Sequence, residues 1–336
     1  MDFKQNLTID DIARELGVSK TTVSRAISGK GRISESTRAR VQDFIARHNY
    51  RPNAAAKSLA ESRTYNIALV LPKAFIKLDL PHVRHVMSAI CEEAYLQDYN
   101  ILLCLSADDT VPPLLRTIDN RKVDGVILSR TVEDDPVVEI LSRRNIPFAT
   151  IGSLPEADRG KAVVETDHDQ VGGCRAFSKA FIQAGSGKIA ILGNDMNYIV
   201  NQSRMSGIRQ AAAETGFPHS MLGLRMDLDD RRSRYAAAEE MLKLGYRRFL
   251  CMDEDVCLHA MERLQQLGCR IPADVQIASL YDSEQLANTI PPVSALEFSA
   301  AQIGRSACRE LLHYLKGDRY DPNPVLGYRI IKRAST

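Results

Sequence analysis

Lys20, Thr21 and Arg25 share the exposed face of a short helix that the sequence predicts over Lys20–Ser28. A guanidinium such as that of Arg25 can donate two parallel hydrogen bonds to a guanine edge, the commonest base-specific contact in protein–DNA complexes. Short hydroxyl side chains bind phosphate oxygens instead. Three of them flank these residues: Ser19, Thr22 and Ser24. The combination predicts a helix that enters the major groove of DNA.

Neighbouring helices must hold such a helix, and the flanking sequence predicts two. Thr8 suits the N-cap of a first helix, which Gly17 ends. A third helix starts at Ser34 or Ser36 and stops before Pro52. Two short helices joined by a tight glycine turn, the second of them polar, form a helix-turn-helix. Taken alone, the pattern also suits a solvated helix pair that packs only for stability.

Charge is unevenly distributed along the chain. The 336 residues carry 44 lysines and arginines against 42 acidic residues, a net charge of +2. Residues 1–63 hold 12 basic and seven acidic residues, which leaves 32 and 35 for the remainder. A basic N-terminal module on a mildly acidic body favours an anion-binding N-terminal unit. The overall composition excludes a disordered or fibrous chain.

The sequence also indicates a cellular compartment. Seven scattered cysteines, with no C-x-x-C pair, argue against a disulfide framework or a zinc site. The N-terminal residues lack the apolar stretch of a signal peptide, and no apolar run reaches the length of about 18–20 residues that a membrane span needs. We therefore expect a soluble cytoplasmic protein with free thiols and no membrane association.

From residue 65 onward, apolar runs alternate with helical segments. The first run, Asn66–Leu71, is continuously apolar, as expected of a strand buried on both faces. Further strands are predicted at 101–105, 124–128, 148–151, 188–192, 249–252 and 276–280, and helices at 82–97, 168–184, 201–215, 232–244 and 257–267. This alternation indicates parallel α/β sheets, and its length favours two Rossmann-like lobes.

Other patterns do not support catalysis or metal binding. Gly185–Lys188 lacks the first glycine of a phosphate loop and comes before a strand rather than after one. Asp167, His168 and Asp169 have donor atoms for a metal, but adjacent residues at a helix start point in different directions. A helix cap with first-turn acids is expected there instead. We expect no enzymatic activity, no catalytic residues, no cofactor and no metal.

The segment Leu7–Arg25, with Tyr50-Arg-Pro-Asn53 and Ala56-Lys-Ser-Leu-Ala60, resembles the headpiece and hinge of the lactose-repressor/galactose-repressor (LacI/GalR) family. Motifs of the body, including Arg204-Met-Ser-Gly-Ile and Gly268-Cys-Arg-Ile-Pro, resemble the same family. The resemblance covers nearly the whole chain. It implies a small all-α helix-turn-helix headpiece and a periplasmic-binding-protein-like α/β effector domain of two Rossmann-like lobes.

The resemblance also implies boundaries. The headpiece is expected at residues 1–50, the hinge helix and linker at 51–63, and the effector-binding and dimerisation domain at 64–336. Lobe one is expected at about 64–163 and 293–322, and lobe two at about 164–292 and 323–336. The chain lacks the leucine-heptad tail of tetrameric relatives, so a homodimer is expected.

By this resemblance the chain is a sequence-specific transcriptional regulator that binds a pseudo-palindromic operator in double-stranded DNA. The hinge becomes helical when two copies meet in the minor groove, where Leu59 wedges between base pairs and kinks the duplex. The linker alternative is that Leu59 packs against the body or its symmetry mate. The residues expected to contact DNA are Thr8, Ser19, Lys20, Thr21, Thr22, Ser24, Arg25, Ser28, Arg32, Ser34, Tyr50, Asn53, Ala56, Leu59 and Ala60.

The resemblance further implies a small effector, a sugar or sugar derivative, between the two lobes. The expected effector-binding residues are Phe75, Arg204, Glu254, Asp255, Tyr281 and Asp282. Relatives in this family have Asn-Asp at the positions of Glu254-Asp255, and Asp-Asp at the positions of Tyr281-Asp282. The resemblance therefore does not identify a particular sugar. A polyol, an amino sugar and a phosphorylated sugar stay open. We expect a repressor of carbohydrate-metabolism genes. The alternatives are a cytoplasmic sugar-binding protein and a regulator that answers to a protein partner.

Overall fold

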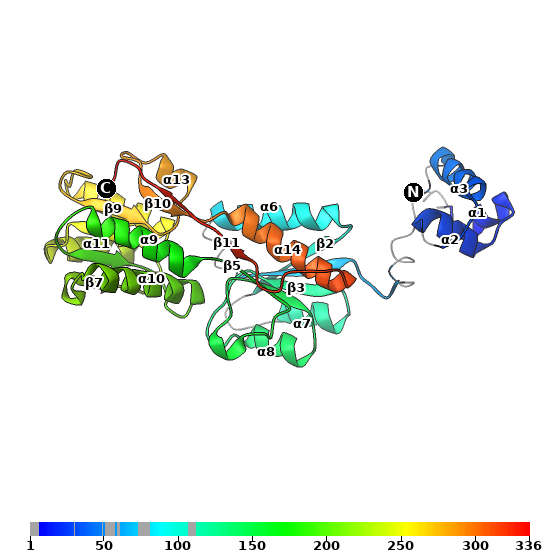
Figure 1. Cartoon of the computed structure of the whole chain (residues 1–336), viewed down its shortest axis with the longest axis horizontal. Helices are drawn as coiled ribbons and strands as arrows, with labels where there is room; N and C mark the ends of the chain where they lie inside the picture. The colour runs from blue at the N-terminus through cyan, green and yellow to red at the C-terminus, as the bar shows by residue number, and fades with distance from the viewer. Residues whose placement is uncertain are drawn as a thin grey trace. The chain divides into compact units, whose positions relative to one another are not determined.

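The computed structural model describes residues 7–29, 31–48, 50, 58, 61–72, 81–106 and 112–336. The chain divides into two compact units, residues 1–64 and residues 65–336 (Figure 1). The division falls beside residue 64, where the larger domain is expected to begin. Among the described residues, no helix has both the length and the apolar character that a bilayer crossing requires.

Three helices build the smaller unit: α1 (Ile9–Leu16), α2 (Lys20–Ser28) and α3 (Glu35–His48). Gly17 ends α1 in the left-handed conformation, at φ 63°, so that Ser19 can start α2 two residues later. Arg40 of α3 donates a hydrogen bond to the carbonyl of Leu16 at 3.0 Å and fixes the end of α1. The core consists of Ile12, Ala13, Val23, Ala26, Val41 and Tyr50. This arrangement confirms the helix-turn-helix.

The first of two sheets in the larger unit has the strand order β11-β5-β4-β3-β1-β2. Its strands are β1 (Asn66–Pro72), β2 (Asn100–Ser106), β3 (Gly125–Leu128), β4 (Phe148–Ile151), β5 (Val164–His168) and β11 (Val325–Leu326). All neighbours are parallel. One face is covered by α6 (Pro81–Leu96) and α14 (Ala300–Lys316), the other by α7 (Pro112–Asp119) and α8 (Pro136–Arg143) (Figure 1). We call this sheet and its helices lobe one; the 3-10 turn η1 (Glu156–Asp158) follows β4.

The second sheet has the order β12-β10-β9-β8-β6-β7. Its strands are β6 (Ile189–Leu192), β7 (Leu222–Arg225), β8 (Arg248–Cys251), β9 (Gln276–Ser279), β10 (Ser294–Glu297) and β12 (Arg329–Ile331). Only β12 is antiparallel to its neighbour. The helices are α9 (Gln170–Gln183) and α10 (Ile199–Thr215) on one face, and α11 (Arg231–Lys243) and α12 (Glu254–Gln266) on the other. We call this lobe two, which includes the 3-10 turn η2 (His219–Met221) and the short α13 (Glu284–Ala287).

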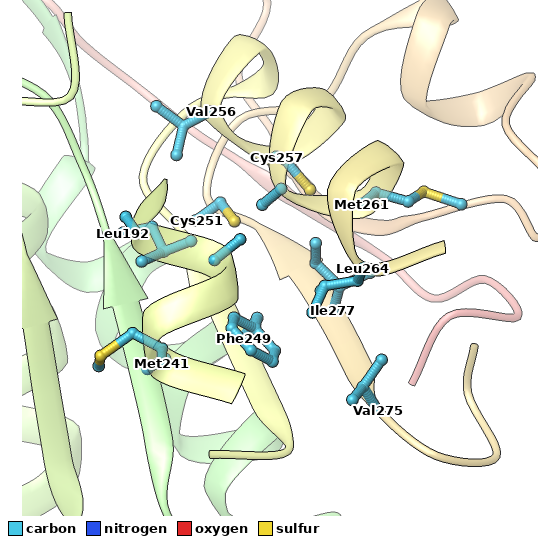
Figure 2. Close-up of a cluster of buried hydrophobic side chains, with 14 of the residues drawn as sticks. Leu192, Met241, Phe249, Cys251, Val256, Cys257, Met261, Leu264, Val275 and Ile277 are labelled. Carbon is cyan, nitrogen blue, oxygen red and sulfur yellow. The ribbon is translucent and has the colours of Figure 1, made fainter. Parts of the chain in front are cut away.

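Lobe two has a hydrophobic core on each face of its sheet. Successive residues of β8 point to opposite faces, so Phe249 and Cys251 pack under α11 and α12 while Leu250 packs under α9 and α10. Figure 2 shows the first of these cores, in which Cys251 lies beside Cys257 of α12. A strand that is buried on both faces must be apolar throughout, which is why β1 and β6 are recognisable as continuous apolar runs.

The expected lobe boundaries are wrong for three strands. β5 and β11 belong to lobe one, and β10 belongs to lobe two. The last two strands of the chain belong to different sheets, because β11 pairs with β5 and β12 pairs with β10. The lobes are therefore joined by three crossings of the chain, after β5, after β10 and after β11. The alternation of strands and helices along the sequence does not by itself show where the chain leaves one sheet for the other.

Candidate functional site

The expected DNA-contact hydroxyls at the helix starts of the headpiece serve as caps. Thr8 forms a capping box with Asp11, accepting its N–H at 3.2 Å. Ser19 accepts the N–H of Thr22 at 3.1 Å, and Ser34 accepts the N–H of Thr37 at 3.2 Å. Caps of this kind satisfy N–H groups that the first helical turn leaves free. A second role at phosphate remains a prediction for these three residues.

The face of α2 that the sequence singles out is exposed. Lys20, Thr21, Ser24 and Arg25 all lie on the solvent side of the helix, while Val23 is fully buried. The Nζ of Lys20 lies 2.6 Å from the Oδ1 of Asp10 in α1, and both side chains are largely exposed. An exposed ion pair of this type contributes little and can exchange for phosphate.

Arg25 lies against the loop that follows its helix. A Cβ built on Gly31 would lie 3.0 Å from the Cδ of Arg25, and Gly31 has a φ of 90°. A side chain at this position would therefore displace the arginine as well as strain the backbone. Glycine at position 31 leaves Arg25 free to adopt this path along the surface.

Other expected DNA contacts fall in different surroundings. Arg32 is exposed, whereas Tyr50 is only 9% exposed and packs in the headpiece core. Burial raises the pKa of the Tyr50 phenol. Ser28 ends α2, and its side chain lies outside the described part of the structure. The remaining expected contacts lie outside the described residues: Asn53, Ala56, Leu59 and Ala60.

In the larger unit, Arg204 lies at the centre of the expected effector site. It is 7% exposed, and its Nη1 donates to the backbone carbonyl of Met252 at 2.7 Å. Its Nε has no partner among the described residues. Gly207, one turn along α10, lets the helix pack directly on α9, since a Cβ there would lie 2.6 Å from the carbonyl of Val171. This close packing holds in place the part of the α10 backbone that carries Arg204.

Glu254 and Tyr281 join Arg204 in one cluster. The Cζ of Arg204 lies 5.7 Å from the centre of the Tyr281 ring, and burial, with a further contribution from Glu254, raises the pKa of that phenol. Glu254 is 3% exposed, and its Oε2 has no partner among the described residues. Its Oε1 lies 3.3 Å from the Nδ1 of His82, a residue of lobe one. The ring of His82 meets Tyr281 edge-on, with centres 5.3 Å apart. This cluster, residues 82, 204, 254 and 281, spans both lobes.

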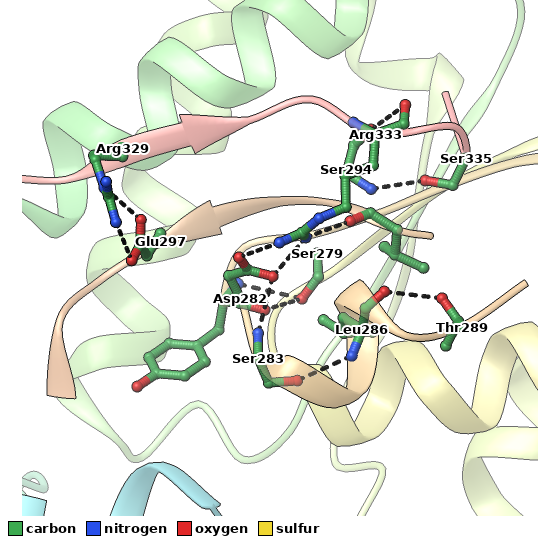
Figure 3. A network of polar contacts seen from close by, with 12 residues as sticks. Ser279, Asp282, Ser283, Leu286, Thr289, Ser294, Glu297, Arg329, Arg333 and Ser335 are labelled. Atoms are coloured by element: carbon green, nitrogen blue, oxygen red, sulfur yellow. Dashed lines mark hydrogen bonds and ion pairs between the residues drawn. The ribbon is translucent and has the colours of Figure 1, made fainter. Parts of the chain in front are cut away.

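Two expected effector residues point elsewhere. Asp255 pairs with the buried Arg234 and lies 3.5 Å from His259, on the side of α12 that faces α11. Asp282 accepts two hydrogen bonds from Arg333, each 2.7 Å long, and so holds the C-terminal segment (Figure 3). Both carboxylates are used in structural ion pairs. Phe75 lies outside the described residues.

Three residues near Arg204 were not expected at an effector site. Asp253 caps α12 and accepts from the Nδ2 of Asn194 at 2.6 Å; burial raises its pKa. Asp167 accepts from the N–H and Oγ of Ser153 at 2.9 and 2.8 Å, and burial raises its pKa as well. Burial lowers the pKa of His168 to about 4. The only sequence signal was the Asp167-His168-Asp169 run, of which Asp169 does cap a helix, α9.

A cavity of about 440 Å³ is lined by residues of both lobes. It is lined by the segments that follow β4 and β5 and by the first turns of α9 and α10. Its lining includes Asp167 and Ser203, and Ser203 immediately precedes Arg204 on α10. The cavity lining includes none of residues 82, 204, 254 and 281, whose side chains pack on one another.

These groups can bind a polar ligand. The cluster combines an arginine donor, a carboxylate acceptor and a phenol, a set that suits hydroxyl groups. Among the described residues there is no group of three histidine, cysteine or acidic side chains that could hold a metal ion.

Two stretches of the chain match known protein families. Residues 8–53 match a family described as bacterial regulatory proteins, lacI family. Residues 179–336 match a family described as periplasmic binding protein-like domain. The first stretch contains the three headpiece helices, and the second contains Arg204, Glu254 and Tyr281.

The chain is similar to regulators over most of its length. It is 27% identical to the HTH-type transcriptional regulator RegA of Clostridium saccharobutylicum over 335 residues, which cover 98% of this chain and 99% of that protein. It is 31% identical to the HTH-type transcriptional regulator RafR of Escherichia coli over 241 residues, which cover 71% of this chain and 70% of that protein.

Solved structures share the fold. A lac repressor dimer bound to operator and the anti-inducer ONPF superposes with a TM-score of 0.80 at 21% identity, covering 99% of each chain. A complex of the transcriptional regulator CelR with cellobiose superposes with a TM-score of 0.72 at 24% identity, covering 98% of this chain and 100% of that one. At these identities the likeness establishes the architecture of a headpiece and a two-lobed body.

Proposed function

Because the chain belongs to the LacI family of bacterial regulatory proteins, we propose that it is a repressor whose operator affinity is set by a small effector bound at the boundary between its lobes. The observation that carries this proposal is the exposed face of α2, with Lys20, Thr21 and Arg25 displayed on a helix whose opposite side is buried. Family membership makes the chain a DNA-binding transcriptional regulator; repression and effector control are the proposal.

The headpiece reads DNA through α2. Its exposed side chains enter the major groove, and Arg25 donates to a guanine edge. The hinge residues Asn53, Ala56, Leu59 and Ala60 are proposed to contact the minor groove, with Leu59 as the wedge. A repressor of this kind binds a pseudo-palindrome as a homodimer, with one copy of α2 in each half-site.

A homodimer needs a self-complementary apolar surface, and lobe one offers one. Tyr95 and Leu96 at the end of α6 are 80% and 76% exposed, and Leu103 on β2 is 45% exposed. β2 is also an edge strand of its sheet. Exposed apolar side chains beside an open sheet edge are typical of an interaction surface, and we propose that this surface pairs with a second copy.

Effector control is proposed to act through the cluster that spans both lobes. A ligand that binds Arg204 or Glu254 competes with their present contacts, among them the contact between Glu254 and His82 of lobe one. The ligand therefore shifts the equilibrium towards the lobe arrangement that it binds more tightly. The size of the shift equals the difference between its binding free energies for the two arrangements. The relative position of two hinges in a dimer follows the lobes, so DNA affinity changes with it. A carbohydrate effector is supported by the hydroxyl-binding residue types.

The test is binding of the full-length protein to DNA upstream of its own gene neighbourhood, at one stated salt concentration, with and without a panel of sugars, amino sugars and sugar phosphates. We expect specific binding that one compound weakens or strengthens by tenfold or more. Arg25→Ala should lose specific binding while ligand binding persists. Absence of specific binding would overturn the repressor proposal, and specific binding that responds only to a protein partner would overturn effector control.

A further inference from the structure

A short β-bridge joins the two lobes, in addition to the three crossings of the chain. Val132 of lobe one lies opposite Tyr198 of lobe two, and the two backbones run antiparallel. Val132 belongs to the segment between β3 and α8, and Tyr198 immediately precedes α10. The guanidinium of Arg130 lies over the Tyr198 ring, with its Cζ 5.6 Å from the ring centre. The loop that follows β3 in lobe one therefore contacts the loop that follows β6 in lobe two.

Each lobe donates one backbone hydrogen bond to the other at this bridge. The N–H of Glu133 donates to the carbonyl of Asn197 at 3.2 Å. In return, the N–H of Ile199 donates to the carbonyl of Thr131 at 3.2 Å. Ile199 is the first residue of α10, so its N–H has no acceptor within the helix. Lobe one therefore satisfies a backbone group that the helix itself leaves free.

Side chains extend the contact. The Nε2 of Gln202 donates to the Oε1 of Glu133 at 3.1 Å. Val132 is 6% exposed and Ile199 is 8% exposed. Within the described part of the chain, neither side chain is a member of a hydrophobic core of its own lobe. We attribute their burial to the contact between the lobes.

The side of the bridge that belongs to lobe two is held in place by its own lobe. The Oδ1 of Asp195 accepts the N–H of Asn197 at 2.8 Å, and the carbonyl of Asp195 accepts from the Nδ2 of Asn201 at 2.8 Å. Gln202 donates a further hydrogen bond to the carbonyl of Met196 at 3.0 Å. A segment that is already ordered loses less conformational entropy when the bridge forms.

We infer that residues 130–133 and 197–202 form a clasp that holds the lobes together without a ligand, and that an effector acts by opening it. Every group of the clasp belongs to the chain itself, so its formation requires no bound molecule. Glu133, Ile199 and Gln202 also line the cavity formed by both lobes. Opening the clasp therefore opens one wall of that cavity.

The other contact across the boundary favours the same direction of motion. The Oε1 of Glu254 lies 3.3 Å from the Nδ1 of His82 in lobe one. A ligand that binds Glu254 competes with this contact. Two contacts between the same two bodies strengthen each other, because forming one brings the partners of the other together. Loss of the Glu254 contact therefore weakens the clasp. The inference rests on the proposed function, because it assigns the direction of the lobe motion that the effector causes.

Amide-resolved hydrogen exchange of the full-length protein, with no compound added, tests the clasp. The amide of Ile199 is the reporter, since its acceptor belongs to lobe one. Val132→Asp places a charge at a buried position of the boundary and should open the clasp. We expect the Ile199 amide to exchange about tenfold or more faster in this variant than in the wild type. Glu133→Gln keeps both the Oε1 and the N–H of the clasp, so it is the matched control and should exchange like the wild type. Equal exchange in Val132→Asp and the wild type would overturn the clasp.

A disulfide provides the opposite perturbation. Val132 and Tyr198 form a non-hydrogen-bonded antiparallel pair, in which Cα atoms lie about 4.5 Å apart, within the range of a disulfide. Val132→Cys/Tyr198→Cys should therefore cross-link on mild oxidation. The cross-linked protein should bind operator like the wild type, within about twofold, whereas Val132→Asp should change operator affinity by about tenfold or more. Failure of this pair to cross-link would also overturn the clasp.

The panel of sugars, amino sugars and sugar phosphates separates the clasp from the proposed function. A compound that changes the operator affinity of the wild type should speed exchange at Ile199 and should leave the cross-linked protein unresponsive. A compound that changes operator affinity but slows this exchange would support effector control and overturn opening as its mechanism. If Val132→Asp exchanges faster but binds operator like the wild type, the clasp is confirmed and control of operator affinity by the lobes is overturned.

Discussion

The carboxylate of Asp282 and the guanidinium of Arg333 form a two-point ion pair, with both N–O distances at 2.7 Å and with side chains 11% and 18% exposed (Figure 3). The same guanidinium donates to the carbonyl of Val293 at 2.7 Å. This pair ties the C-terminal segment, which has just crossed from lobe one, to the loop that carries Tyr281. Asp282 therefore has a structural role, whereas its neighbour Tyr281 belongs to the cluster around Arg204.

Arg333→Met is expected to lower the free energy of unfolding by roughly 3 kcal/mol, because it leaves a largely buried carboxylate unpaired. Arg329→Met is the matched control, since Arg329 pairs with Glu297 but is itself 74% exposed. It should lose no more than about 1 kcal/mol. Urea unfolding of both variants measures the difference. Equal losses would show that burial of the Arg333 pair has no energetic consequence.

Gly31→Ala is expected to weaken specific operator binding by about tenfold, because the new Cβ displaces Arg25 and a base contact of this type contributes about 1–3 kcal/mol. Gly29→Ala is the control. Gly29 also has a positive φ, 69°, but no other atom lies within 4 Å of its built Cβ. Both variants should lose about 1 kcal/mol of stability from the left-handed conformation. Fluorescence anisotropy with operator DNA separates them, and equal operator affinities would contradict a role for this contact.

Stability should depend on pH through His168. Burial lowers its pKa from 6.5 to about 4 in the folded protein, so between these pH values the unfolded chain binds the proton and the folded one does not. The free energy of unfolding is therefore not reduced by His168 above pH 6.5. It falls by roughly 3 kcal/mol in total as the pH is lowered towards 4. Asp167, whose pKa is raised, has the opposite trend.

Comparing the wild type with His168→Gln isolates this histidine, because Asp167 is present in both proteins. Urea unfolding from pH 7.5 to pH 4.5 should show the wild type losing stability faster than the variant. Parallel curves would mean that His168 titrates normally in the folded state.

The double variant Leu96→Glu/Leu103→Glu is expected to be monomeric, since it places charge on the apolar surface proposed to pair two copies. Light scattering coupled to size-exclusion chromatography measures the mass, and far-UV circular dichroism checks the fold. Leu244→Glu, at a separate position that is 52% exposed, should remain dimeric. If the double variant keeps the dimer mass, the interface lies elsewhere.

The headpiece could be predicted from the sequence because its signals are local. The Ser19 cap, the Gly17 turn and the alternation of Val23 with exposed neighbours act within one or two helical turns. Strands such as β1, β3 and β6 were recognisable because full burial requires a run of apolar residues. β5, β7 and β10 were not predicted, because each is short and contains a charged residue. The burial of Tyr50 could not be predicted, because it depends on a core built from all three helices rather than on its neighbours in sequence.

The helix-turn-helix headpiece and the α/β body could be predicted from the sequence alone, which also marked Arg204 as a candidate effector residue. Which residue of each adjacent pair faces the site depends instead on how distant elements pack together. Glu254 turns to His82 while Asp255 turns to Arg234, because consecutive residues of a helix point about 100° apart. The sheet to which each of β5, β10 and β11 belongs was likewise decided by pairing between distant segments. Asp167 and His168 acquire their environment only where both lobes enclose them, since desolvation depends on neighbours that the chain brings together in space.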